Sequence, residues 1–135
     1  MADQYEKNRG IQRYQFASPR NCSLSIISFN GLARTDHVVR IMDMSVIGLG
    51  IETTEMLEPG LVWFKKQVVG HRVGIIEWTG ERSGKNRAGI RFVTLSREEE
   101  RIVREEMSGK QSLPLRQDRE KALAAILKQF RKVTP

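Results

Sequence analysis

The sequence predicts a mainly β protein, in which a small antiparallel barrel or sandwich is followed by α-helices. Short apolar runs recur between turn-forming residues every dozen or so positions, which is typical of such folds. These runs fall at residues 14–29, 37–42, 49–51, 61–64, 73–78 and 88–95. From residue 96 onward, the apolar positions repeat with the period of a helix instead. The length of 135 residues fits one domain with one sizeable core.

Turn-forming residues set the predicted strand ends. Residues 30–31 (Asn-Gly) and 58–60 (Glu-Pro-Gly) are strong turn sequences. Pro19 predicts an interruption of the first long strand, because proline cannot donate a hydrogen bond to a central ladder. Residues 80–87 are rich in glycine and charge, and are predicted to form a hairpin loop. Residues 43–50 are predicted to join two strands.

Two helices are expected after the strands. Ser96 and Glu99 form a capping-box pattern at the start of the first helix, which ends near residue 107. Residues 108–114 form a predicted linker, and residues 115–135 a second, amphipathic helix. We expect this helix to pack on the barrel rather than to form a partner or dimer surface. Its apolar stripe consists of Leu123, Ile126, Leu127, Phe130 and Val133.

The domain organisation follows from these elements and from the polar start of the chain. Residues 1–13 lack periodicity and are predicted to be a flexible arm, and residues 14–107 are predicted to hold the barrel and the first helix. Lys and Arg outnumber Asp and Glu by 23 to 16, which gives a net charge of +7 and favours anionic partners. Cys22 is the only cysteine, and no apolar run resembles a secretory leader or a membrane span. These features predict a soluble, cytoplasmic protein.

The residues offer little material for catalysis. His37 and His71 are the only histidines, so neither a multi-histidine metal site nor a hydrolytic triad is expected. Gly80, Gly84 and Lys85 are spaced too closely for a phosphate-binding loop. We therefore expect no enzyme, no metal and no cofactor.

Two groups of residues suit a guanine nucleotide. Arg9 and Arg13 can converge on one anion, and a guanidinium group binds phosphate, or the O6 and N7 edge of guanine, with two hydrogen bonds. Asp43 can accept hydrogen bonds from the N1 and N2 donors on the opposite guanine edge. The hydroxyl of Ser45 can donate to a phosphate, and Gly48 permits close approach of the backbone.

The two groups together resemble the paired signature of the PilZ family, bacterial receptors for cyclic di-GMP. The similarity covers roughly residues 9 to 96, and the two motifs, in this order on one strand-rich domain, are fairly specific. The matching segments are Arg9-x-x-x-Arg13, Asp43-x-Ser45-x-x-Gly48, residues 58–60, residues 76–78 and residues 88–92.

This resemblance implies a six-stranded antiparallel barrel followed by a helix. It assigns Arg9 and Arg13 to the phosphates and guanine bases, and Asp43, Ser45 and Gly48 to the opposite rim. Asn8 occupies the position that, in relatives, influences whether one ligand or a stacked pair is bound. Arg40 and Arg91 are additional candidate contacts.

The expected function is that of a cyclic di-GMP receptor or adaptor, whose arginine arm closes over the nucleotide and alters contact with an unidentified protein effector. A homodimer is a further possible assembly. One alternative is a degenerate PilZ domain that docks proteins without nucleotide, since Ile47 stands where many relatives have a small residue. The other is a basic barrel that binds single-stranded nucleic acid. That class needs exposed aromatic residues, and the aromatic residues here fall mostly on apparent core positions.

Overall fold

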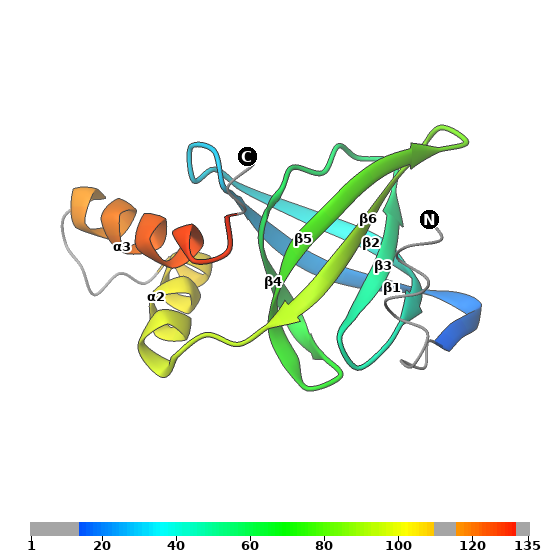
Figure 1. Ribbon diagram of the computed structural model, residues 1–135, viewed down its shortest axis with the longest axis horizontal. Helices are drawn as coiled ribbons and strands as arrows, with labels where there is room; N and C mark the ends of the chain where they lie inside the picture. Colours follow the sequence, from blue (N-terminus) through cyan, green and yellow to red (C-terminus); the bar gives the residue numbers. More distant parts are fainter. Residues whose placement is uncertain (1–13, 110–115, 132–135) are drawn as a thin grey trace.

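The computed structural model describes residues 14–109 and 116–131 (Figure 1). The predicted arm at residues 1–13 therefore lies outside the described residues, as does most of the predicted linker. The described part of the chain is mainly β, with two helices after the strands. Its elements are β1 (Tyr14–Ser28), β2 (Arg34–Met44), β3 (Gly48–Thr53), β4 (Gly60–Val68), β5 (His71–Arg82), β6 (Lys85–Val93), α2 (Arg97–Ser108) and α3 (Arg116–Lys128).

The six strands form a closed antiparallel barrel in the order β1-β2-β3-β6-β5-β4, with β4 pairing back onto β1. This confirms the predicted fold class. Alternate side chains of each strand point inward, as in any pleated sheet. The buried interior cluster consists of Cys22, Leu24, Ile26, Val39, Ile41, Leu49, Ile51, Leu57, Val62, Phe64, Ile76, Ala88, Ile90 and Phe92.

The two helices pack on the outside of the barrel, at one end of the molecule (Figure 1). Their apolar faces cover the outer face of β1, β4 and β5, where Trp63 is 6% exposed. The expected packing of the last helix on the barrel is thereby confirmed. The residues buried in this second cluster are Ile27, Leu61, Trp63, Val73, Ile75, Val103, Leu123, Ile126 and Leu127.

Polar contacts fix the helices to the barrel and to each other. The hydroxyl of Ser96 accepts from the backbone N–H of Glu99 (3.1 Å), and the Glu99 carboxylate accepts from the backbone N–H of Ser96 (2.9 Å), so the predicted capping box is present. At the other end of α2, Arg34 of β2 donates to the carbonyl of Met107 (2.9 Å). The Gln129 amide donates to the Glu99 carboxylate and joins the end of α3 to the start of α2.

The predicted interruption near Pro19 affects the pairing of the first strand and not its course. β1 continues through Pro19, but its register with β2 shifts between Gln15 and Arg20. One local prediction was wrong. The loop predicted over residues 80–87 is instead a two-stranded ribbon, which turns only at Ser83 and Gly84. Both turn residues have positive φ (54° and 77°), as a tight two-residue hairpin turn requires. Both faces of this ribbon lie in solvent, so its sequence carries no apolar alternation.

None of the helices in residues 14–109 and 116–131 has the length and apolar character needed to cross a membrane.

Candidate ligand-binding face

The turn between β2 and β3 holds the predicted motif. Asp43 lies near the end of β2, Ser45 lies in the turn, and Gly48 opens β3. The backbone N–H of Ser45 donates to the carbonyl of Gly48 (2.8 Å), and the N–H of Ile47 donates to the Ser45 hydroxyl (3.3 Å). The carbonyl of Ile47 accepts from the N–H of Phe92 on β6 (2.8 Å). Ser45 is 2% exposed, so its hydroxyl helps to fix the shape of the turn.

Gly48 is required by the packing of β3 against β6. A β-carbon at this position would lie 2.0 Å from the carbonyl oxygen of Ile90 and 3.1 Å from the α-carbon of Arg91. Both obstacles are backbone atoms, which cannot move aside without distorting the sheet. The close approach that glycine permits here is therefore between two strands.

Four residues form a row across the outer face of the barrel. Asp43 on β2 pairs with Gly50 on β3, Gly50 pairs with Gly89 on β6, and Gly89 pairs with Trp78 on β5. Directly paired residues point to the same side of a sheet, and the adjacent Leu49 belongs to the interior cluster. All four therefore face outward. We refer to this set, Asp43, Gly50, Gly89 and Trp78, as the outer row.

The two glycines leave room for the larger side chains beside them. A β-carbon on Gly50 would lie 3.1 Å from the Asp43 carboxylate, and one on Gly89 would lie 2.1 Å from the indole nitrogen of Trp78. The carboxylate thus lies above β3, and the indole lies above β6. Trp78 remains 41% exposed. The outer row therefore combines a carboxylate acceptor with an accessible aromatic ring.

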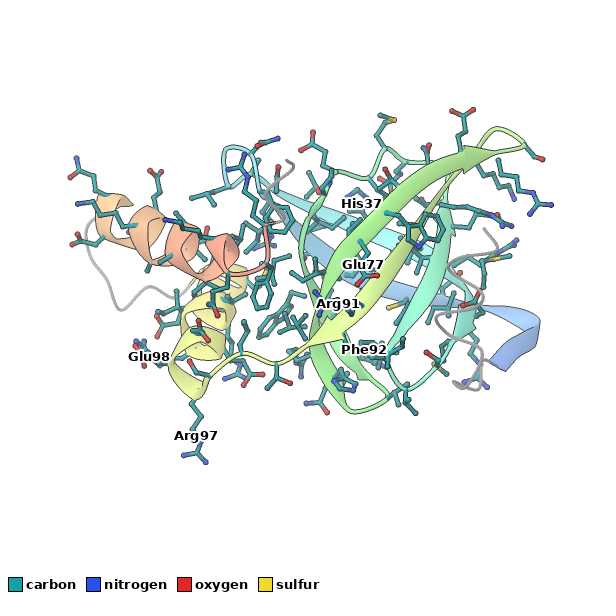
Figure 2. All side chains as sticks on the ribbon, viewed as in Figure 1. His37, Glu77, Arg91, Phe92, Arg97 and Glu98 are labelled. Carbon is teal, nitrogen blue, oxygen red and sulfur yellow. The ribbon has the colours of Figure 1, made fainter. Side chains whose placement is uncertain are left out.

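Arg91 lies next to the outer row on the same face. It pairs with Gly48 on β3 and with Ile75 on β5. Its Nε donates to the Glu77 carboxylate at 2.5 Å, and its side chain is 44% exposed (Figure 2). Glu77 lies at a register shift between Ile76 and Trp78, where β5 has one residue more than β6. Such a β-bulge turns consecutive side chains toward one side of the sheet.

Arg40 also points outward from β2 and is exposed, in register with Glu52 on β3. Glu52 already binds two other cations, Arg87 at 2.9 Å and Lys85 at 3.5 Å. The hydrogen bond from Arg87 is the main reason that the pKa of Glu52 is lowered. Arg40 therefore adds positive charge beside the outer row, since the acid paired with it on β3 is held by two other cations.

The structure thus brings together five of the predicted residues. Asp43, Ser45 and Gly48 meet at one turn, Arg91 pairs with Gly48, and Arg40 flanks the row. The remaining predicted residues, Asn8, Arg9 and Arg13, lie outside the described residues. The first described residues of β1 are informative here, because Tyr14 pairs with Met44 and Gln15 pairs with Asp43. The chain that follows Arg13 therefore enters the barrel directly beside Asp43.

Sequence reasoning did not assign a role to Gly50, Gly89, Trp78 or Glu77. The outward positions of two facing strands are glycine at residues 48, 50 and 89, and this pattern in the sequence could have suggested a surface cleared of side chains. The pairing of Gly89 with Trp78 could not be predicted from the sequence, because it depends on strand register across the bulge.

The two histidines lie elsewhere. His37 is buried, with Nε2 2.8 Å from the Thr35 hydroxyl, and His71 stacks on Phe92. Within the part of the chain that the structure describes, no group of three or more His, Cys, Asp or Glu side chains could hold a metal ion.

No protein-family model matches this chain, and no curated protein matches it at a significant level.

Proposed function

We propose that this protein is a PilZ-type receptor for cyclic di-GMP in the bacterial cytoplasm, which binds the nucleotide without converting it. The observation that carries this proposal is the outward carboxylate of Asp43, which stands at the β2–β3 turn of a closed six-stranded barrel. Beside it, β1 begins immediately after Arg13. The strand that follows the arginine motif in the sequence is thus paired with the strand that carries Asp43.

The outer row suits one edge and one face of a guanine base. Asp43 offers acceptors for the N1 and N2 donors of guanine, and an adenine in the same place would leave the carboxylate without those donors. The exposed ring of Trp78 offers a surface for base stacking, which contributes about 1–3 kcal/mol per base in other proteins. Selectivity for guanine then comes from the acid, and much of the affinity comes from the aromatic ring.

The arginines suit the phosphates. Arg9 and Arg13 supply planar donors that bind phosphate or the guanine O6 and N7 edge in a bidentate manner. Arg91 and Arg40 add positive charge on the same outer face. A ligand with two phosphates and two guanine bases would use both the arginines and the outer row. In this scheme the arm closes over the nucleotide and alters contact with a protein effector.

Titration calorimetry at physiological salt tests the proposal. We expect cyclic di-GMP to bind, with cyclic di-AMP, GTP and random single-stranded DNA binding far more weakly. Arg9→Ala and Arg13→Ala should each weaken binding by about 2 kcal/mol, because each removes charged hydrogen bonds. Unchanged affinity in both variants would reject the arginine assignment.

The same titration separates the alternatives. A protein that keeps its fold and binds no nucleotide would be a docking module that has lost the ligand. A preference for oligonucleotides, with affinity falling steeply as salt rises, would indicate a single-stranded nucleic-acid protein. The exposed Trp78 favours that alternative. However, among residues 20–109 and 117–131 it is the one large aromatic residue that is exposed, and such proteins use several aromatic residues in series.

A further inference from the structure

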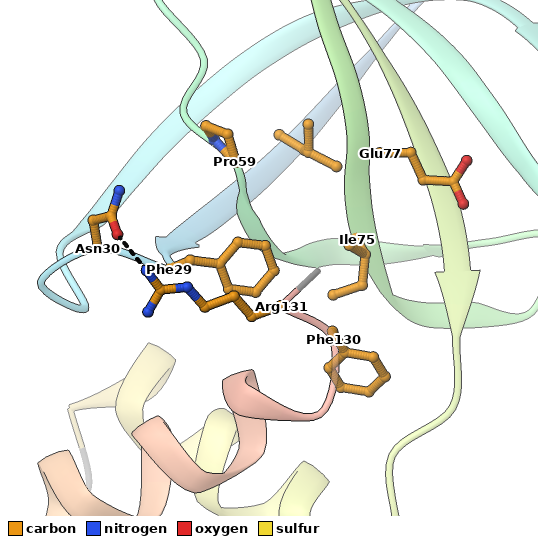
Figure 3. A pocket seen from close by; sticks show the side chains of 8 residues that line it. Phe29, Asn30, Pro59, Ile75, Glu77, Phe130 and Arg131 are labelled. Atoms are coloured by element: carbon orange, nitrogen blue, oxygen red, sulfur yellow. Dashed lines mark hydrogen bonds between the residues drawn. The ribbon is translucent and has the colours of Figure 1, made fainter. Parts of the chain in front are cut away.

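The bulge in β5 lies between the outer row and the end of α3. Trp78, on one side of it, lies over Gly89 in the outer row. Glu77, the extra residue, lines a cavity of about 230 Å³ between the barrel and the segment that follows α3 (Figure 3). One bulge therefore contributes to both surfaces. The cavity is lined by Phe29, Asn30, Pro59, Ile75, Ile76, Glu77, Phe130 and Arg131.

Glu77 binds one cation, Arg91, and lines the cavity together with a second cation, Arg131. Its carboxylate accepts from Arg91, and in Figure 3 it points away from the cavity. Arg131 points the other way and makes a long hydrogen bond (3.4 Å) to the side-chain oxygen of Asn30. Side-chain rotation toward the cavity would bring the two opposite charges toward each other without moving a strand.

A dianionic ligand on the outer face would compete for Arg91. Arg91 is paired with Gly48 at the end of the turn, and its side chain points to the outer face, where its guanidinium group binds Glu77. Arg91 is therefore positioned to serve a ligand on this face as well as Glu77. Phosphate oxygens and carboxylate oxygens accept hydrogen bonds from the same N–H groups of an arginine. Once Arg91 turns to the phosphate, the Glu77 carboxylate loses its partner, and Arg131 is the other cation that lines its cavity.

We infer that Glu77 is a switch carboxylate, paired with Arg91 in the free protein and with Arg131 when an anionic nucleotide occupies the outer face. The inference rests on the proposed function, and it adds a route by which binding reaches the helical end of the molecule. The exchange fastens the residues after α3 to β5 through the Glu77–Arg131 pair. Because such coupling is reciprocal, Arg131 must strengthen nucleotide binding by the same factor.

A double-mutant cycle in the full-length protein tests this relationship. Cyclic di-GMP is titrated by calorimetry at low salt into the wild type, Glu77→Gln, Arg131→Gln and the double variant. Arg131→Gln should weaken binding about threefold when Glu77 is present, the size expected for an exposed ion pair, and should have no effect in the Glu77→Gln background. Glu77→Gln should tighten binding in the Arg131→Gln background. There it frees Arg91 for the ligand, and no Glu77–Arg131 pair exists that could be lost.

Lys128→Gln is the matched control, since it removes an exposed cation from the last turn of α3 outside the cavity. It should leave affinity unchanged. Amide hydrogen exchange over residues 123–131 supplies a structural measurement, and the nucleotide should slow exchange there in the wild type but not in Glu77→Gln.

The outcomes distinguish failure of the Glu77 switch from failure of the proposed receptor function. Nucleotide binding with equal affinity in the wild type and Arg131→Gln overturns the switch and leaves the receptor function standing. Equal weakening by Arg131→Gln in both backgrounds also overturns it, because Arg131 would then act on the ligand independently of Glu77. If the wild type binds no cyclic di-GMP, the proposed function fails and the switch fails with it.

Discussion

The carboxylate of Asp43 occupies the space above Gly50 on the neighbouring strand, with Oδ2 3.1 Å from the place where a β-carbon of residue 50 would stand. The position of the acid therefore depends on the absence of a side chain across the β2–β3 pair. Gly50 therefore serves the arrangement of the proposed site, whereas Gly48 on the same strand serves the packing of β3 against β6.

Asp43→Ala should weaken cyclic di-GMP binding by about 2 kcal/mol, since it removes a charged acceptor from the guanine edge. The melting temperature of the ligand-free protein should change little. Calorimetry and thermal unfolding together measure the two quantities. Asp36→Ala is the control for affinity, because it removes a carboxylate from the other end of the same strand. It should leave binding unchanged and lower the melting temperature, since Asp36 accepts hydrogen bonds from Ser25 and Arg34. A large loss of stability in ligand-free Asp43→Ala would mark Asp43 as a structural turn residue.

Gly48→Ala and Gly50→Ala should behave differently, although both glycines lie on β3. At residue 48 the new methyl group would meet the carbonyl of Ile90 at 2.0 Å, so we expect a loss of about 2 kcal/mol in the free energy of unfolding. At residue 50 it would meet the end of the Asp43 side chain, which can rotate. Gly50→Ala should therefore keep its stability in urea unfolding and lose nucleotide affinity. Equal destabilisation by both substitutions would contradict this division.

Tryptophan fluorescence should report on the ligand through one of the two tryptophans. Trp78 is 41% exposed on the outer row, whereas Trp63 is 6% exposed beneath the helices. We expect cyclic di-GMP to change the emission of the wild type and of Trp63→Phe, and to leave the emission of Trp78→Phe unchanged. A response that survives in Trp78→Phe would show that the base does not stack on that ring.

Val69→Asn should stabilise the protein by about 1 kcal/mol. Val69 has a φ of 51° at the tip of the β4–β5 hairpin, a conformation that costs a β-branched residue energy and that asparagine tolerates. Val38 is the matched control, because it is also an exposed valine but lies within β2. Val38→Asn should be neutral or destabilising, since valine favours strands. Chemical denaturation measures both variants, and equal effects would contradict the backbone argument.

The pH dependence of stability should contain a contribution from Glu52. Folding lowers the pKa of this carboxyl, chiefly through its hydrogen bond with Arg87, below the ordinary value of 4.5. The ion pair therefore stabilises the protein above that pH, and the contribution is lost as the pH falls through the lowered pKa. Glu52→Gln should reduce the free energy of unfolding at pH 7 by about 1 kcal/mol. At acid pH the wild type and the variant should differ less in stability, because Glu52 is then protonated in the wild type. Urea unfolding at pH 7 and pH 3 checks both parts.

Local residue patterns predicted much of the fold. Ser96 and Glu99 marked the start of α2, and the apolar stripe that includes Leu123 and Ile126 identified the buried face of α3. The ribbon around Ser83 was missed because both of its faces are polar. In the candidate site, the motif residues Asp43, Ser45 and Gly48 were visible in one short stretch. Their neighbours Gly89 and Trp78 were not, because strand register joins residues that are 35 or more positions from Asp43.

The pairing of Tyr14 with Met44 has a further consequence for the arginines that precede β1. Arg13 is one peptide bond from Tyr14, so any contact that it makes with a ligand on the outer face is an intramolecular event. Short tethers of this kind correspond to effective concentrations in the millimolar range. A protein cleaved after Arg13 would therefore not regain its affinity when the free peptide is supplied at micromolar concentration. The arginines would act through their attachment to the barrel as much as through their charge.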